Sequence, residues 1–171
     1  MLGTQLFEGA NKPDPSRMLV AGNRDPGRHK PHGGLWTSTY DPRIGSNWID
    51  WCIAEEFRGP NFSCWLLEPD PTARVLTIDG PADLAKFKPY LTEYSFSTSD
   101  RILDYEAIGR DYDALHYTVD GARLGHMSAF GFHPLCITLN SVDAESTFWF
   151  RWMFTGVAEL GVLRFGELTV S

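Results

Sequence analysis

The sequence predicts a single α+β domain, and three observations support this fold class. Its 171 residues match the size of one hydrophobic core. Short segments rich in β-branched and aromatic residues are scattered among three or four short helical patterns, without regular alternation. Gly and Pro separate these segments, and no linker, internal repeat or low-complexity tract divides the chain. Parallel β-α-β winding is therefore poorly supported.

The first quarter of the chain contains few regular elements. We expect residues 1–16 to form an irregular N-terminal arm, because residues 8–16 are polar and contain two prolines. The short apolar run at 17–22 predicts a buried strand. Residues 23–34 are rich in Gly and Pro and predict a loop, after which the residues of 35–40 favour a second strand.

The middle of the chain combines helices and strands. Ser46 is a candidate N-cap for a helix that continues with apolar residues at helical spacing to Phe57. Residues 64–68 and 74–79 predict two strands, which the turn at 69–71 would join. Further helices are predicted at 81–91 and 102–112, and further strands at 115–119, 134–139, 146–154 and 162–170.

Charge and composition exclude several classes of protein. The net charge is −7, from 15 Lys and Arg against 22 Asp and Glu, which disfavours generic binding to duplex nucleic acid. The apolar runs are too short for a transmembrane helix, and residues 1–5 lack the start of a secretory signal. Three cysteines at unrelated spacings argue against a disulfide framework. We therefore expect a cytoplasmic protein without a membrane partner.

The charge is unevenly distributed along the chain. Residues 17–43 contain five Lys and Arg residues against two Asp, whereas the rest of the chain is strongly acidic. A cationic segment in an acidic protein is a candidate site for a small anion such as a phosphate. The alternative is a solvated loop with scattered charges.

Common catalytic and metal motifs are absent. His29 and His32 have the spacing of half a zinc site, but no nearby Cys or carboxylate pair completes a tetrahedron. The chain contains no GxxxxGK[ST] phosphate loop, no GxGxxG dinucleotide motif and no GxSxG nucleophile elbow. We expect no bound metal.

The segments 30–40 and 46–52 carry the strongest functional signal. Two glycines before residue 35 allow the backbone to approach a ligand closely. Trp36 offers a flat stacking surface, and the hydroxyls of Thr37 and Ser38 follow it directly. Together with the cationic loop, these groups suit a flat heterocycle that carries a phosphate, such as a dinucleotide. The alternative is an aromatic corner that fills the core.

This pattern resembles the ADP-ribosyltransferase superfamily. Residues 34–38 (GLWTS), followed by a helix that carries Trp51, are similar to the G-F-Y-T-T…A-x-x-W arrangement of many members. Residues 111–116 resemble the entry to a later strand in several of them. The resemblance is greatest to small phage-encoded members, including the anti-CRISPR type.

The resemblance implies a split β-sandwich with several short helices, which binds NAD as a substrate in a cleft between two small sheets. The implied reaction transfers ADP-ribose to a macromolecular acceptor, for which we expect an unidentified protein. Glu145 would be the late-strand catalytic glutamate, with Asp143 two residues before it. In the cofactor site, Trp36 would stack on nicotinamide, Thr37 and Ser38 would fix its polar edges, and Arg24 and Lys30 would face the ribose or diphosphate.

Other functions stay open at this point. NAD glycohydrolase activity would use water as the acceptor. A non-enzymatic interaction protein or virion-associated protein would expose Trp36, Trp48 or Trp149 on a flat or convex face. Glu145 itself could be an ordinary surface residue at a strand end. The enzyme instead requires Glu145 and Trp36 to line one pocket, with the carboxylate within about 10 Å of the indole.

Overall fold

The computed structural model of the protein describes residues 2–23, 30–56, 62–94, 97–128, 142–164 and 167–170. The strands are β1 (Gln5–Gly9), β2 (Leu35–Thr39), β3 (Phe62–Pro69), β4 (Val75–Ile78), β5 (Leu91–Tyr94), β6 (Ser97–Leu103), β7 (Ala114–Tyr117), β8 (Ser146–Trp149), β9 (Phe154–Arg164) and β10 (Glu167–Val170). The α-helices are α1 (Asn47–Ala54), α2 (Tyr105–Asp111) and α3 (Val119–Ser128), and the 3-10 helices are η1 (Pro15–Arg17) and η2 (Pro81–Tyr90). The mixture confirms the α+β class.

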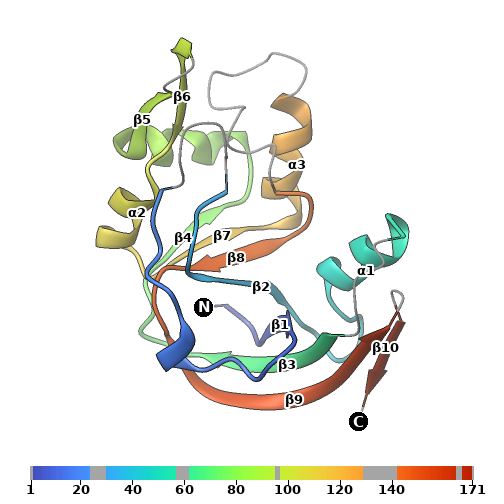
Figure 1. Cartoon of the computed structure of the whole chain (residues 1–171). Helices are drawn as coiled ribbons and strands as arrows, with labels where there is room; N and C mark the ends of the chain where they lie inside the picture. Colours follow the sequence, from blue (N-terminus) through green and yellow to red (C-terminus); the bar gives the residue numbers. More distant parts are fainter. Residues whose placement is uncertain are drawn as a thin grey trace.

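Eight strands form one sheet in the order β10-β9-β3-β1-β2-β8-β7-β4 (Figure 1). Its neighbouring strands run antiparallel except for the parallel pair β4–β7. The chain between these two strands contains η2, α2 and the separate hairpin β5–β6. The sheet therefore contains one parallel crossover that the sequence pattern did not indicate.

The sheet is almost divided between β1 and β2. Only two residue pairs join these strands, Gln5 with Thr39 and Leu6 with Ser38. Beyond them β1 continues along β3 to Gly9, whereas β2 continues along β8 to Leu35. Figure 1 shows the resulting halves, with β1, β3, β9 and β10 below and β2, β8, β7 and β4 above.

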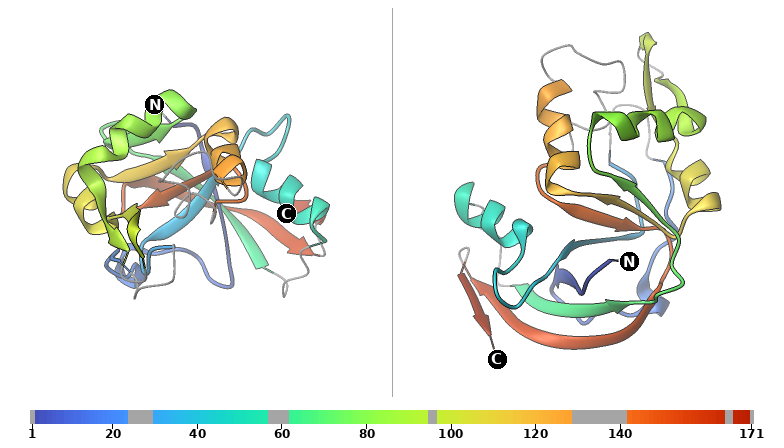
Figure 2. Two further views of the ribbon diagram at one scale, coloured as in Figure 1. Left: turned by 90° about the horizontal axis from the view of Figure 1, so that it is seen from above. Right: turned by 180° about the vertical axis from the view of Figure 1, so that it is seen from behind.

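Each half of the sheet has helices on one face, and the other faces of the two halves point toward each other. The helices η2, α2 and α3 lie over β4, β7 and β8, whereas α1 lies apart from them beside β10 (Figure 2). Phe87, Ile108 and Phe148 are completely buried in the core of the upper half. The inward faces of the halves meet around Leu67 and Trp149, close to the N-terminus.

The N-terminal arm is the main correction to the predicted elements. Within residues 1–16, five residues form β1, which lies in the middle of the sheet. Leu6 and Phe7 pack on opposite faces of the strand, so the segment lacks the polar–apolar alternation of an ordinary half-buried strand. The strand predicted at 17–22 is wrong, because that segment contains only the end of η1 and an isolated bridge between Gly22 and His32.

Several other boundaries differ from the prediction. The strands at 64–68 and 74–79 are present, but they lie in different halves and do not pair. Residues 146–154 form two strands, because the chain bends between Trp149 and Phe154. The helix predicted at 81–91 is a 3-10 helix, and α2 begins at Tyr105 rather than at 102. Phe57 and the strand predicted at 134–139 lie outside the described residues.

Candidate functional site

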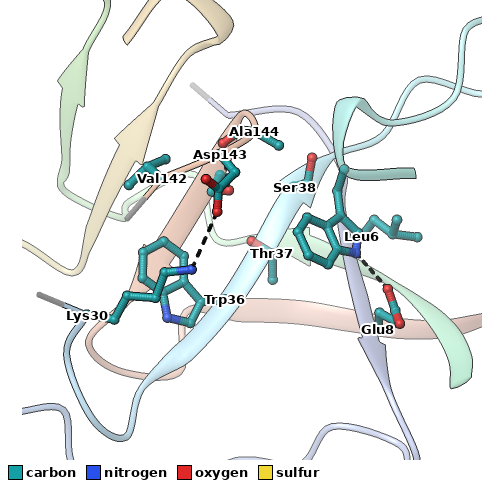
Figure 3. Close-up of a pocket in the computed structure, with 11 residues that line it drawn as sticks. Leu6, Glu8, Lys30, Trp36, Thr37, Ser38, Val142, Asp143 and Ala144 are labelled. Atoms are coloured by element: carbon teal, nitrogen blue, oxygen red, sulfur yellow. Dashed lines mark hydrogen bonds and ion pairs between the residues drawn. The ribbon is translucent and has the colours of Figure 1, made fainter. Parts of the chain in front are cut away.

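A cavity of about 330 Å³ opens where the two halves of the sheet part, on the face that the helices cover (Figure 3). Its walls come from β1, β2, α1 and the segment that leads into β8. The lining residues are Leu6, Glu8, Lys30, Trp36, Thr37, Ser38, Trp48, Val142, Asp143, Ala144 and Ser146. The cavity thus joins the predicted segments at 30–40 and 46–52 to the region around Glu145.

The divergence of β1 and β2 creates this space. Leu6 and Ser38 are directly opposite each other, and side chains two residues further along each strand point to the same face. Continued pairing would therefore have placed Glu8 opposite Trp36. Because the strands separate instead, the two side chains border an opening large enough for a small ligand.

Two indoles form the aromatic walls. Trp36 packs against Phe148 of β8, with ring centroids 4.9 Å apart and an interplanar angle of 47°. Trp48 stacks on Trp51 in α1 at 5.0 Å. Both cavity indoles are only partly buried, so each keeps exposed ring surface that a flat ligand can contact.

The two ends of the cavity differ in charge. At one end Lys30 Nζ lies 4.0 Å from Asp143 Oδ2, and both side chains are partly exposed. At the other end Glu8 Oε2 accepts a hydrogen bond of 2.6 Å from Trp48 Nε1. Burial raises the pKa of Glu8, and the Trp48 bond opposes that rise. Figure 3 shows Lys30 and Glu8 on opposite sides, with Thr37 and Ser38 between them.

Glu145 lies directly behind the cavity wall. The residue is 6% exposed, which excludes an ordinary surface position. Its carboxylate accepts bonds of 2.5 Å from Ser38 Oγ, 2.9 Å from Thr39 N and 2.8 Å from Thr39 Oγ1. Ser38 lines the cavity, so one hydrogen bond separates that surface from the carboxylate.

A second hydroxyl and an amide hold this arrangement in place. Ser46 is the N-cap residue of α1, as predicted, but its Oγ donates to Ser38 Oγ at 2.9 Å and makes no capping bond to the helix. The first residue of α1, Asn47, instead accepts a bond of 2.8 Å from Glu145 N. The start of α1 is therefore tied to both Ser38 and Glu145.

His116 approaches Glu145 from β7. Its Nδ1 lies 3.5 Å from Glu145 Oε1 and 2.9 Å from Thr147 Oγ1. Burial lowers the pKa of His116, and the nearby charges of Glu145 and Asp79 oppose that change. The same imidazole borders a second cavity of about 400 Å³ beside Leu2 and Trp149.

The structure brings together most of the residues that the sequence singled out. Trp36, Ser38 and Lys30 line the cavity, but Glu145 does not, so the expectation that Glu145 and Trp36 line one pocket is not met. The carboxylate is connected to the cavity wall through its bond from Ser38. Arg24 lies outside the described residues. Among the charged residues that line the cavity, the one that the sequence analysis did not identify is Glu8, which stands in a segment read as part of an irregular arm.

Thr37 also borders the cavity, but its hydroxyl is used within the protein. Oγ1 donates to Gln5 Oε1 at 2.7 Å and accepts from Trp149 Nε1 at 2.9 Å. These partners lie on the inward face of the sheet, away from Trp36 and Ser38. The hydroxyl that was expected to contact a cofactor therefore has two partners within the protein.

The described residues contain neither a metal-binding cluster nor a membrane-spanning helix. No group of three or more His, Cys, Asp or Glu side chains with the geometry of a metal site occurs among the described residues. In the same part of the chain, no helix has the length and apolar character needed to cross a bilayer. Comparisons with protein-family models, curated proteins and solved structures give no match to this chain.

Proposed function

We propose that the protein is an NAD-dependent mono-ADP-ribosyltransferase that modifies a macromolecular acceptor, with a protein as the expected target. The main support is the bond between Ser38 and Glu145, which couples a buried carboxylate to a cavity walled by Trp36. The nearly divided sheet is compatible with the split sandwich that the sequence resemblance implies. In this proposal the cavity holds the nicotinamide riboside part of NAD.

The proposed reaction breaks the bond between nicotinamide and ribose. Nicotinamide leaves as a neutral base with the bonding electron pair, and positive charge develops on the ribose. A nucleophile of the acceptor then bonds to the ribose C1 and loses its proton. A fixed negative charge stabilises such a transition state, and the stabilisation is stronger where water is excluded.

Glu145 would supply that charge through a prearranged network. Ser38 Oγ donates to Glu145 and accepts from Ser46, so a hydroxyl oxygen with two lone pairs can accept one more bond from a ribose hydroxyl. The carboxylate needs no movement to act, since hydrogen bonds already hold both its oxygens. Lys30 stands at the cavity mouth, where a diphosphate would meet it.

Replacement of Glu145 with Gln tests this role. We expect nicotinamide release from NAD to fall by about 10²–10³-fold, the usual effect of removing one electrostatic group from an active site. Glu68→Gln is the matched control, because Glu68 accepts a bond from Thr4 in an exposed part of the sheet. Thermal melting of each variant separates loss of chemistry from loss of folding.

Two further measurements complete the test. Trp36→Ala should weaken NAD binding by about 1–3 kcal/mol, as loss of an aromatic stacking partner does elsewhere. Labelled NAD added to a lysate distinguishes ADP-ribose transfer from simple hydrolysis. If the wild-type protein neither binds millimolar NAD nor releases nicotinamide, the proposal is wrong.

The interaction-protein alternative has no specific structural support. Trp149 is completely buried, whereas Trp36 and Trp48 face into a cavity. These three indoles therefore do not make the flat or convex surface that such a function requires.

A further inference from the structure

Among the described residues, the acidic side chain at the Glu8 end of the cavity has an indole as its hydrogen-bond partner and no basic partner. Within the part of the chain that the structure describes, no Lys, Arg or His side chain forms an ion pair with Glu8. Its carboxylate is partly buried in the strand next to β2 and receives a neutral donor, Trp48 Nε1. A buried carboxylate without a cation is costly, so a ligand that brings positive charge is favoured there.

The shape of the same region suits a flat ring. Trp48 on α1 contributes aromatic surface beside Glu8, and Leu6 adds apolar surface there, whereas Trp36 stands beside Lys30 at the other end (Figure 3). Aromatic faces attract cations most strongly when water is excluded from the contact. Charge and shape at this end thus both favour a flat, cationic ligand.

We propose that the end of the cavity formed by Glu8, Trp48 and Leu6 is a site for a flat, positively charged heteroaromatic ring, with Glu8 as its charge partner. This inference rests on the proposed function when the ring is the pyridinium of NAD, and it makes Glu8 a specificity-determining residue. Lys30 at the opposite end then orients the ligand, with its phosphates directed away from Glu8.

The proposal has a definite kinetic consequence. The ring is cationic in bound NAD but becomes neutral as nicotinamide leaves, so the contact with Glu8 stabilises the bound substrate more than the transition state. Removal of such a contact raises KM without lowering kcat. Glu8 would therefore select oxidised NAD over its reduced form, whose dihydronicotinamide ring has no charge.

Binding of two small rings tests the site independently of any activity. The probes are 1-methylnicotinamide, which is a cation, and nicotinamide, which is neutral and nearly isosteric. We expect the wild-type protein to bind the cation about tenfold more tightly, by calorimetry or tryptophan fluorescence. Glu8→Gln keeps an oxygen acceptor for Trp48 but should abolish the preference, whereas Glu8→Asp should retain most of it.

The control is Glu55→Gln, which removes the same charge from an exposed residue after α1. It should leave the preference intact. Equal binding of the two rings by the wild-type protein, or an unchanged preference in a folded Glu8→Gln variant, would overturn the inference. If Glu8→Gln does not fold, the wild-type comparison alone decides.

The outcomes also separate this inference from the proposed function. If the protein prefers the cationic ring but releases no nicotinamide from NAD, the ring site is supported and the transferase proposal is wrong. If the protein releases nicotinamide from NAD but binds the two rings equally, the transferase proposal is supported and the role of Glu8 is wrong.

Discussion

Gly33 and Gly34 turn the chain into β2 and so position Trp36 and Ser38. Their φ angles are +64° and +60°, in the left-handed region that favours glycine. A Cβ on Gly34 would lie 2.3 Å from the ring of Phe148 and 2.7 Å from the backbone oxygen of Trp149. This close approach explains why the Gly-Gly pair precedes the strand.

Gly34→Ala is therefore expected to destabilise the fold strongly. Backbone strain and overpacking against β8 should together lower the free energy of unfolding by on the order of 2–6 kcal/mol. Gly45→Ala is the matched control, because its φ is +85° but no atom lies within 4 Å of its added Cβ. Urea unfolding should show a clearly larger loss for Gly34→Ala; equal losses would contradict the packing explanation.

At the scale of elements, strand β2 lines the cavity with one face and packs inside the protein with the other. Trp36 and Ser38 point toward the cavity, whereas Thr37 bonds Gln5 of β1 and Trp149 of β8. Because β1 and β2 share only two residue pairs, the Thr37–Gln5 bond is an additional link between the halves of the sheet.

Thr37→Val should accordingly affect stability and leave the ligand site intact. The variant keeps the shape of the side chain but leaves Gln5 and Trp149 without this buried partner, at a cost of about 1–3 kcal/mol each. Thr4→Val, which removes an exposed bond to Glu68, should cost much less. Chemical denaturation measures both. If the Thr37→Val variant has normal stability but binds NAD more weakly, the hydroxyl contacts the ligand and the structural explanation is wrong.

At the scale of the whole molecule, two buried groups give opposite pH dependences. Burial lowers the pKa of His116 from its usual 6.5, so the unfolded chain binds its proton more readily and stability falls as the pH drops below about 6.5. Burial raises the pKa of Glu8 above 4.5, so the folded chain binds that proton more readily and stability rises as the pH falls toward 4.5.

Variants separate the two contributions. Between pH 6.5 and about 4.5, His116→Gln should reduce the acid-induced loss of stability, whereas Glu8→Gln should make it steeper. Partly exposed carboxyls such as those of Asp41 and Asp70 have pKa values lowered from 3.8, so their effect is confined to more acidic solutions. Melting temperatures across this range provide the measurement. A His116→Gln profile parallel to the wild type would show that His116 does not titrate on unfolding.

The sequence was informative wherever a local pattern determines structure. Residues 35–39 carry β-branched and aromatic side chains and form β2, and the apolar spacing after Ser46 gives α1. Local patterns failed where long-range packing dominates. β1 became a central strand because β2 and β3 pair with its two edges, and residues 150–153 interrupt the late strand because Phe150 N bonds Asp113 O.

The candidate site divides in the same way. The sequence alone predicted the α+β class and supplied Trp36, Ser38 and Lys30 as candidates from residue type and local spacing, and Glu145 from the family resemblance. The contact of Glu145 with Ser38 behind the cavity wall, and the position of Glu8 at the same cavity, follow from the packing of the strands. Those positions depend on which strands pair and where β1 and β2 separate, and pairing between segments far apart in the chain leaves no local pattern to read.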